Sequence, residues 1–226
     1  MCGRYTIGVP LEELMLRYHI DMTGIRFFAP RYNVAPGQPV PAVLHDGSRY
    51  RLGELRWGLV PEWAADDKLA YRTINARAET IADKPAFRGP FQRKRCVLPA
   101  DSFYEWKAAG GGKQPMRIML KSGALFGMAG LYDTWVSPEG AKISTCTVIT
   151  TTPNELVAGI HDRMPVILRP EDEPLWLDRS VTAAGELRGL LRPYPAEEMT
   201  AYPVSSRVGN VRNDDPACAE EIRLLL

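Results

Sequence analysis

The sequence has no hydrophobic run approaching the roughly 20 residues that a membrane-spanning helix requires. Its N-terminal stretch, MCGRYTIGVPLEEL, lacks the basic-then-apolar layout of a secretory signal. Internal repeats and low-complexity tracts are also missing. These absences argue against a helical membrane protein and favour a cytoplasmic one with no membrane partner. No feature indicates an obligate oligomer, so we expect a monomer.

Cysteine and histidine are scarce, with four and three residues respectively. The cysteines are Cys2, Cys96, Cys146 and Cys218, and the histidines are His19, His45 and His161. None of the cysteines are paired at metal-ligand spacing, so we expect neither a metal nor another cofactor. Disulfides are not expected in a reducing cytosol. Cys96 and Cys146 lie in apolar, strand-like runs, which predicts buried and unreactive thiols.

The sequence is rich in short segments with strand character. The candidates are Gly3–Gly8, Val40–His45, Leu55–Leu59, Arg95–Pro99, Met116–Leu120, Leu125–Tyr132, Ser144–Thr151 and Tyr202–Val204. The 19 prolines and 19 glycines are spread along the chain and separate many short elements. The run Gly110–Gly112 is interpreted as a hairpin loop, because strand patterns continue on both sides of it.

Helices are expected to be fewer and short. One follows Pro10, where four residues share a helical face: Leu11, Leu14, Met15 and Tyr18. A second starts from an N-cap at Thr152 with Pro153 at its first position, and a third covers residues 182–192. Strands with interspersed helices predict an α+β fold, a single domain over residues 1–226 with a curved, barrel-like mixed sheet.

Positive charge is concentrated in the first half of the chain. Residues 1–117 hold 18 Lys and Arg against 12 Asp and Glu, whereas residues 118–226 hold 10 against 15. A basic half would attract phosphate, although such a split also arises by chance. One segment mixes basic and aromatic residues: Phe87, Arg88, Phe91, Arg93, Lys94 and Arg95. That mixture suits single-stranded nucleic acid, and the alternative is a solvated charged face. Asn75 and Arg77 alternate along an extended stretch, so they would share a face and could meet one ligand.

Cys2 follows the initiator methionine, whose removal is favoured by the small cysteine side chain. The mature N-terminus would then carry an α-amine and a thiol, with ordinary pKa values of about 8 and about 8.5. Both groups would be partly deprotonated near neutral pH. Such a 1,2-aminothiol condenses with an aldehyde: the amine forms a Schiff base, and the thiolate then closes a thiazolidine ring. The alternative is that Cys2 is merely a small buried residue.

Two residues are candidates for proton transfer in this chemistry. Glu105 lies between Tyr104 and Trp106, and burial among aromatic rings would raise its pKa toward neutrality. Its alternative is a strand residue that faces solvent. His161 lies at the end of a predicted helix, where the imidazolium form is favoured. Its alternative is a histidine that only satisfies the helix terminus.

Eight segments together resemble the SOS-response-associated peptidase (SRAP) family, whose members crosslink themselves to abasic sites in single-stranded DNA. The segments are CGRY at 2–5, YNVAPGQ at 32–38, WGLVPEW at 57–63, NARAET at 75–80, RCVLPA and FYEW within 95–106, GMAGLYD at 127–133, IHDRMPVIL at 160–168 and VSSRVGNVRND at 204–214. They cover nearly the whole chain in the family's order, and the ordered set is specific.

The resemblance implies a single α+β domain with a basic groove, and a role for each of ten residues. Cys2, exposed by removal of Met1, would attack the C1′ aldehyde of the ring-opened abasic sugar and end as a thiazolidine that shields the lesion. Glu105 would act as general acid and base, His161 would assist proton transfer to the sugar, and Asn75 would hydrogen-bond the product. The residues assigned to flanking DNA are Arg4, Asn33, Pro39, Arg77, Trp106 and Arg163.

Two points qualify the resemblance. The family usually has glycine where this chain has Ser102, and a positive φ there would strain the serine. The family name presumes a peptidase, which removal of its own Met1 or release of its own crosslink would explain. We therefore expect an abasic-site crosslinking enzyme with possible lyase and self-processing activity, without general proteolysis.

Two other functions stay open at this point. Glutamine amidotransferases also begin Met-Cys-Gly, with Cys2 attacking an amide, but the Gly-rich loops of that class are not found here. A non-enzymatic single-stranded DNA-binding module, or an adaptor for a partner protein, would explain the basic half without using Cys2.

Overall fold

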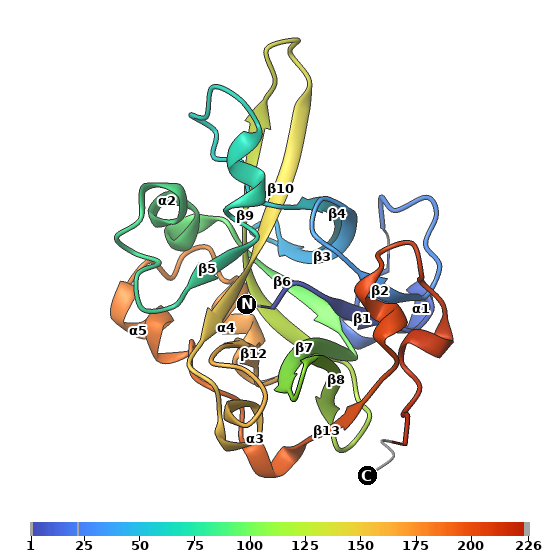
Figure 1. The fold of residues 1–226 in the computed structure, drawn as a ribbon. Coiled ribbons are helices and arrows are strands. Elements are labelled where there is room, and N and C mark those ends of the chain that lie inside the picture. The colour runs from blue at the N-terminus through green and yellow to red at the C-terminus, as the bar shows by residue number, and fades with distance from the viewer. Residues whose placement is uncertain (1, 22, 224–226) are drawn as a thin grey trace.

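The computed structural model describes residues 2–21 and 23–223 (Figure 1). Its strands are β1 (Tyr5–Ile7), β2 (Arg31–Val34), β3 (Pro39–His45), β4 (Tyr50–Trp57), β5 (Asn75–Arg77), β6 (Arg95–Ala100), β7 (Ser102–Ala109), β8 (Gly112–Leu120), β9 (Phe126–Val136), β10 (Lys142–Thr151), β11 (Met164–Pro165), β12 (Ile167–Leu168) and β13 (Met199–Pro203). Its α-helices are α1 (Leu11–Arg17), α2 (Pro85–Arg93), α3 (Glu155–Ala158), α4 (Glu173–Leu177) and α5 (Ala184–Gly189). Its 3₁₀ turns are η1 (Lys68–Tyr71), η2 (Ala196–Glu198), η3 (Ser206–Gly209) and η4 (Pro216–Cys218).

Five strands close into a barrel. Strand β10 pairs with β4, and the pairing continues through β3, β6 and β9 back to β10. Strands β4 and β5 run parallel to β10, whereas the neighbours within β4–β3–β6–β9 are antiparallel, so the sheet is mixed. The predicted α+β fold with a barrel-like mixed sheet and a few short helices is confirmed.

A close approach between barrel strands explains one glycine. A Cβ at Gly130 would lie 2.9 Å from Sγ of Cys96 and 3.0 Å from the carbonyl oxygen of Thr147. These distances leave no room for a side chain, so only glycine lets β6, β9 and β10 meet here. Cys96 and Cys146 are fully buried in this region, as their apolar runs predicted, and burial raises the pKa of both thiols.

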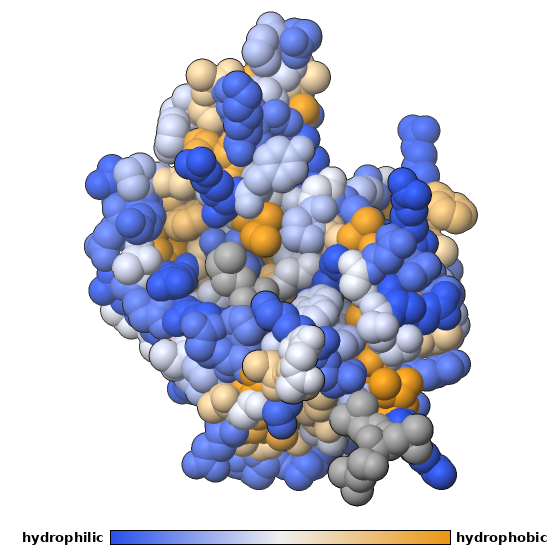
Figure 2. Space-filling model, viewed as in Figure 1, coloured by the Kyte–Doolittle hydropathy of each residue, from blue (hydrophilic) through white to orange (hydrophobic). Residues whose placement is uncertain are grey.

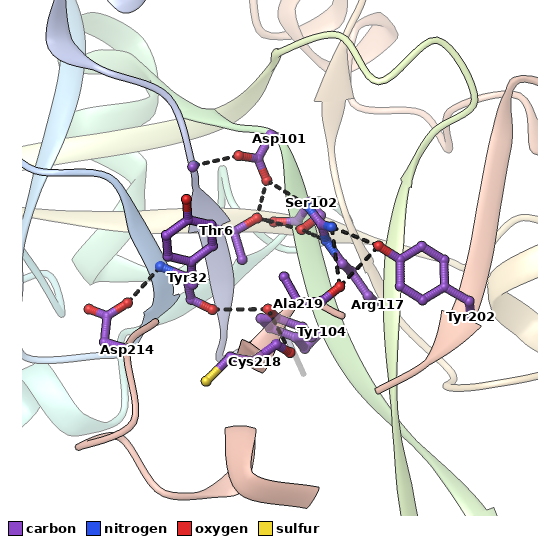
Figure 3. Close-up of polar contacts among 11 residues, drawn as sticks. Thr6, Tyr32, Asp101, Ser102, Tyr104, Arg117, Tyr202, Asp214, Cys218 and Ala219 are labelled. Carbon is purple, nitrogen blue, oxygen red and sulfur yellow. Dashed lines mark hydrogen bonds and ion pairs between the residues drawn. The ribbon is translucent and has the colours of Figure 1, made fainter. Parts of the chain in front are cut away.

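A second, antiparallel sheet positions the start of the chain. Its strand order is β13–β8–β7–β1–β2, and the Gly110-Gly111 turn joins β7 to β8 as the predicted hairpin. A buried polar network crosses this sheet (Figure 3): Arg117 on β8 donates to the Ser102 hydroxyl at 2.8 Å and to Tyr202 on β13 at 2.6 Å. Thr6 on β1 bonds to both Asp101 and Ser102.

Ser102 therefore has a structural reason to be a serine. It lies in an extended strand, and it is not among the described residues with positive φ. The condition for strain, a positive φ, is therefore not met at Ser102. Its hydroxyl is fully buried and has two polar partners, Arg117 and Thr6.

The helices differ from prediction at specific places. Helix α3 starts after Asn154 rather than Thr152, because the Asn154 side chain accepts the N-cap bond from the Val157 amide at 2.9 Å. Helix α5 is shorter than predicted, and α2 and α4 were not expected. No helix among the described residues is long and apolar enough to cross a membrane.

In the basic and aromatic segment around α2, the aromatic rings are buried and two of the cations already have partners within the protein. Phe91 is buried, and Arg95 is nearly so. The Arg95 guanidinium donates to the carbonyl oxygens of Trp176 at 2.6 Å and Phe91 at 2.9 Å. Lys94 pairs with Asp133 at 2.7 Å. Phe91, Lys94 and Arg95 therefore join α2 to neighbouring elements, whereas Arg88 and Arg93 are exposed, and contact of this segment with nucleic acid stays a prediction.

Candidate functional site

The pairing of β1 with β7 brings Cys2 to Glu105. Tyr5 lies opposite Phe103, and the next Tyr104 amide donates to the carbonyl oxygen of Arg4 at 3.0 Å. The chain before β1 therefore continues along β7 toward Glu105. Cys2 is fully buried, and this burial raises the pKa of its thiol; the negative charge of Glu105 raises it further. The expectation of a partly deprotonated thiol is wrong, because the buried thiol keeps its proton at neutral pH.

Glu105 and His161 form the polar centre of the site. The Oε2 atom of Glu105 lies 3.8 Å from Nε2 of His161. Only 2% of Glu105 is exposed, and burial raises the pKa of its carboxyl to about 7. The predicted shift toward neutrality is confirmed. A carboxyl with this pKa exchanges protons readily near neutral pH.

His161 is held in a defined orientation just after α3. Its amide donates to the carbonyl oxygen of Val157 at 2.8 Å, and its Nδ1 accepts from the Arg163 amide at 3.1 Å. The same Nδ1 also lies 3.0 Å from a carboxylate oxygen of Asp162, and Nε2 faces Glu105. Burial lowers the pKa of His161, so the expected stabilisation of the imidazolium by a helix end is wrong. The four-residue α3 has too small a dipole to outweigh desolvation.

Asn75 and Arg77 share one face of β5, as their alternation predicted. Both residues line a cavity of 410 Å³ together with Arg163. Strand β5 is held parallel to β10, with Asn75 aligned to Val148. The side-chain nitrogen and oxygen of Asn75 are both buried, and neither has a hydrogen-bond partner among the described residues. A buried amide without partners costs stability, which is typical of a group that bonds to a ligand.

Asn33 holds Arg4 and the C-terminal part of the chain. Its amide nitrogen donates to the carbonyl oxygens of Val208 at 3.1 Å, Asn210 at 3.1 Å and Asn213 at 2.6 Å. Its oxygen accepts from Arg4 at 2.8 Å. Asn33 has no exposed surface, so this geometry contradicts a direct DNA contact and makes it a positioning residue for Arg4.

Three other residues assigned to DNA are accessible. Pro39 and Arg77 are exposed, and Trp106 is partly exposed. The Arg4 guanidinium lies 5.9 Å from the centre of the Trp106 ring, and it also donates to the carbonyl oxygen of Gly209 at 3.2 Å. The guanidinium of Arg4 and the ring of Trp106 thus lie side by side, and Arg4 is anchored to the backbone near Gly209.

Arg163 is nearly buried and already paired. Its guanidinium forms a two-pronged ion pair with Glu79, at 2.7 and 2.9 Å, and donates to the carbonyl oxygen of Thr150 at 2.7 Å. Sequence analysis missed Glu79, although it lies in the same NARAET segment as Arg77. Among the described residues there is no group of three or more His, Cys, Asp or Glu side chains that could hold a metal ion.

A family model described as SOS response associated peptidase (SRAP) matches residues 1–211. The chain therefore belongs to the SRAP family.

Particular relatives span most of its length. The chain is 51% identical over 222 residues to the abasic site processing protein YoqW of Bacillus subtilis (strain 168), covering 97% of this chain and 99% of that protein. It is 37% identical over 230 residues to the abasic site processing protein HMCES of Gallus gallus, covering 87% and 68%. A crystal structure of a Bacteroides thetaiotaomicron protein matches with a TM-score of 0.90 and 29% identity, covering 98% of this chain and all of that one.

Proposed function

We propose that this protein processes abasic sites in single-stranded DNA by linking itself to them covalently through Cys2, after removal of Met1. The names of the relatives support the substrate. The observation that carries the mechanism is Cys2 buried beside Glu105, whose carboxyl lies 3.8 Å from His161. The covalent link would shield the lesion.

The reaction uses both nucleophiles of Cys2. The α-amine adds to the C1′ aldehyde of the ring-opened sugar, and loss of water gives an imine. The thiol then adds across the C=N bond: sulfur bonds to C1′, and the thiol proton ends on the nitrogen. One aldehyde and one aminothiol thus give one thiazolidine and one water.

Glu105 is suited to both proton transfers. With a pKa of about 7, its carboxyl can protonate the departing hydroxyl and its carboxylate can take the proton of the thiol. A base is needed because burial raises the pKa of the Cys2 thiol. His161 presents its Nε2 toward this centre and would protonate the opened sugar oxygen. Asn75 would bond to the product through its unpartnered amide.

The imine is also the intermediate of strand cleavage by β-elimination. The proposal therefore includes a lyase side reaction, which ring closure by the thiol suppresses.

Met1 removal by the protein itself is a separate part of the proposal. Intact mass should show Met1 lost from protein refolded without cellular aminopeptidases, and Met1 retained there would contradict it.

The test is an adduct assay with a single-stranded oligonucleotide that contains one abasic site. Wild-type protein should give one heat- and denaturant-stable adduct per site, and Cys2→Ala should give none. Cys146→Ala is the matched control, because that thiol is equally buried but belongs to the barrel. A stable adduct in Cys2→Ala would rule out the thiazolidine. Robust ammonia release from glutamine would favour an amidohydrolase instead.

A further inference from the structure

The carboxylate of Glu79 is linked to His161 through one guanidinium. Glu79 follows β5 and accepts from both terminal nitrogens of Arg163, at 2.7 and 2.9 Å. The two residues are 84 positions apart in the sequence, so the ion pair is a tertiary contact. Arg163 in turn comes two residues after His161. The pair therefore connects the end of β5 with the loop that carries His161.

The Arg163 guanidinium is also held from a second side, by β10. One of its terminal nitrogens donates to the carbonyl oxygen of Thr150 at 2.7 Å. Thr150 is aligned with both Arg77 on β5 and Pro165 on β11. A planar guanidinium with partners on two sides has one favourable orientation. Because β11 starts at Met164, directly after Arg163, the backbone at residue 163 is held in place as well.

The Nδ1 atom of His161 has two neighbours that require opposite protonation states. The Arg163 amide donates to it at 3.1 Å, which requires a lone pair on Nδ1. The Asp162 carboxylate lies 3.0 Å away and can bond to Nδ1 only if that atom carries a proton. In a neutral ring, the proton sits on Nε2 in the first case and on Nδ1 in the second. The neighbour that prevails therefore decides whether the nitrogen facing Glu105 carries a proton.

Two features favour the amide over the carboxylate as the partner of Nδ1. The amide belongs to a backbone segment that the Arg163 guanidinium and β11 hold in place, so its hydrogen bond requires little further ordering. The Asp162 side chain is 86% exposed, so water stabilises its carboxylate without help from the ring. The hold on Arg163 thus determines which partner prevails.

Glu79 lies at a surface where an ion pair contributes little to stability. Its side chain is 45% exposed, and Figure 2 shows hydrophilic surface between the places where Figure 1 shows β5 and α3. Water and salt weaken the attraction between charges in such a place. The two-pronged geometry is nevertheless specific, because both carboxylate oxygens are used. The pair is therefore better suited to fixing an orientation than to stabilising the fold.

We infer that Glu79 is a positioning residue for the proposed reaction. Through the Arg163 guanidinium, it holds the Arg163 amide against Nδ1 of His161. The neutral ring then carries its proton on Nε2, which faces Glu105. The inference rests on the proposed function, in which His161 protonates the opened sugar oxygen. No proton passes through Glu79, and its contribution lies in the orientation and the tautomer of the ring.

Glu79→Gln tests the inference, because it removes the charge of the side chain and keeps its size. The Arg163 amide is then no longer held, and adduct formation at saturating protein should slow by about 10-fold or more. The freed guanidinium carries an uncompensated charge, so noncovalent binding should be unchanged or tighter. Binding is measured by fluorescence anisotropy on a single-stranded oligonucleotide with tetrahydrofuran, which lacks the aldehyde, at the lesion position. A slower reaction without weaker binding is the expected result.

Glu198→Gln is the matched control. The Glu198 side chain is 42% exposed, close to the 45% of Glu79, and it pairs with Arg169 at 2.8 Å. Its hydrogen-bond partners are Arg169 and Tyr194, which lie outside the loop at 161–163. This variant should form the adduct at the wild-type rate. Thermal melting of both variants checks that they fold.

A double-mutant cycle shows whether Glu79 acts through Arg163. Arg163→Ala removes the guanidinium and keeps the backbone amide, so it should also slow adduct formation. Adding Glu79→Gln to this variant should cause no further loss, because the link between the carboxylate and the loop is already broken. Losses that multiply in the double variant would overturn the inference.

Nitrogen-15 NMR of the histidine rings reports the tautomer of His161 without DNA. The chain has three histidines, and the signal that is absent from His161→Gln identifies this ring. At about pH 8, where the ring is neutral, wild-type protein should show a protonated Nε2 and an unprotonated Nδ1. Glu79→Gln should shift the proton toward Nδ1, which can then bond to Asp162. Glu198→Gln should keep the wild-type signals.

Unchanged nitrogen signals in Glu79→Gln would overturn the inference, as would a wild-type adduct rate or weaker noncovalent binding of that variant. The two assays also separate this inference from the proposed function. A wild-type protein that forms no adduct contradicts the proposed function, whereas the ring signals still decide whether Glu79 sets the tautomer of His161.

Discussion

His161 turns its Nε2 toward the Glu105 carboxylate at 3.8 Å, while its Nδ1 accepts a hydrogen bond from the backbone. Burial moves the two pKa values in opposite senses, raising that of Glu105 to about 7 and lowering that of His161. The neutral forms of both groups are therefore favoured. Such a pair can pass a proton in either direction near neutral pH.

This relationship predicts the pH dependence of adduct formation. As pH falls through about 7, Glu105 becomes protonated and can no longer accept the thiol proton, so the rate should fall. Glu105→Gln should lower the rate by about 100-fold or more and should abolish this limb of the profile. Rates are measured by quenched gel assays across pH. Glu62→Gln, an exposed carboxyl, is the control. An unchanged limb in Glu105→Gln would contradict the assignment.

Arg77 and Arg163 should differ in how they affect DNA binding. Arg77 is exposed, whereas the charge of Arg163 is neutralised by Glu79. Arg77→Ala should reduce the slope of log Kd against log salt by about 0.7, the value for one phosphate of a single strand. Arg163→Ala should lower thermal stability and leave the slope nearly unchanged. Equal slope changes in the two variants would show that Arg163 contacts phosphate.

Asn33→Ala should destabilise the fold and weaken the hold on Arg4. The substitution removes the Asn33 donor from the carbonyl oxygens of Asn210 and Asn213 and removes the side-chain acceptor of Arg4. We expect a loss of about 1–3 kcal/mol in the free energy of unfolding, measured with urea. Asn210→Ala is the control, since the Asn210 side chain is exposed. If both variants are equally stable, the interpretation of Asn33 as a positioning residue fails.

Ser102→Gly should destabilise the protein, although glycine is the usual family residue here. The change removes a buried acceptor of Arg117 and adds backbone freedom in the unfolded chain. The expected loss is about 1–3 kcal/mol, measured by urea unfolding. A glycine variant more stable than the wild type would mean that the serine is strained after all.

The sequence was sufficient for the barrel strands and for the identity of the main reactive groups. The run Arg95–Pro99 is mostly apolar and the run Ser144–Thr151 is rich in β-branched residues, as expected for buried strands, and both lie in the barrel. Glu105 was predicted to have a raised pKa because its aromatic neighbours are adjacent in the chain. The α-amine and thiol of Cys2 follow from residue type and position alone.

The tertiary structure decided what surrounds these groups. Burial raises the pKa of the Cys2 thiol and lowers the pKa of His161, contrary to what the local sequence predicted. The segments that bury these two residues are far away in the chain. Asn33 was predicted to contact the ligand, but its side-chain amide donates to the carbonyl oxygen of Val208, 175 residues later in the chain, and so it has a positioning role. A residue's type and local pattern set the chemistry available to it. Its pKa, partners and access to a ligand depend on long-range packing, which leaves no local signal in the sequence.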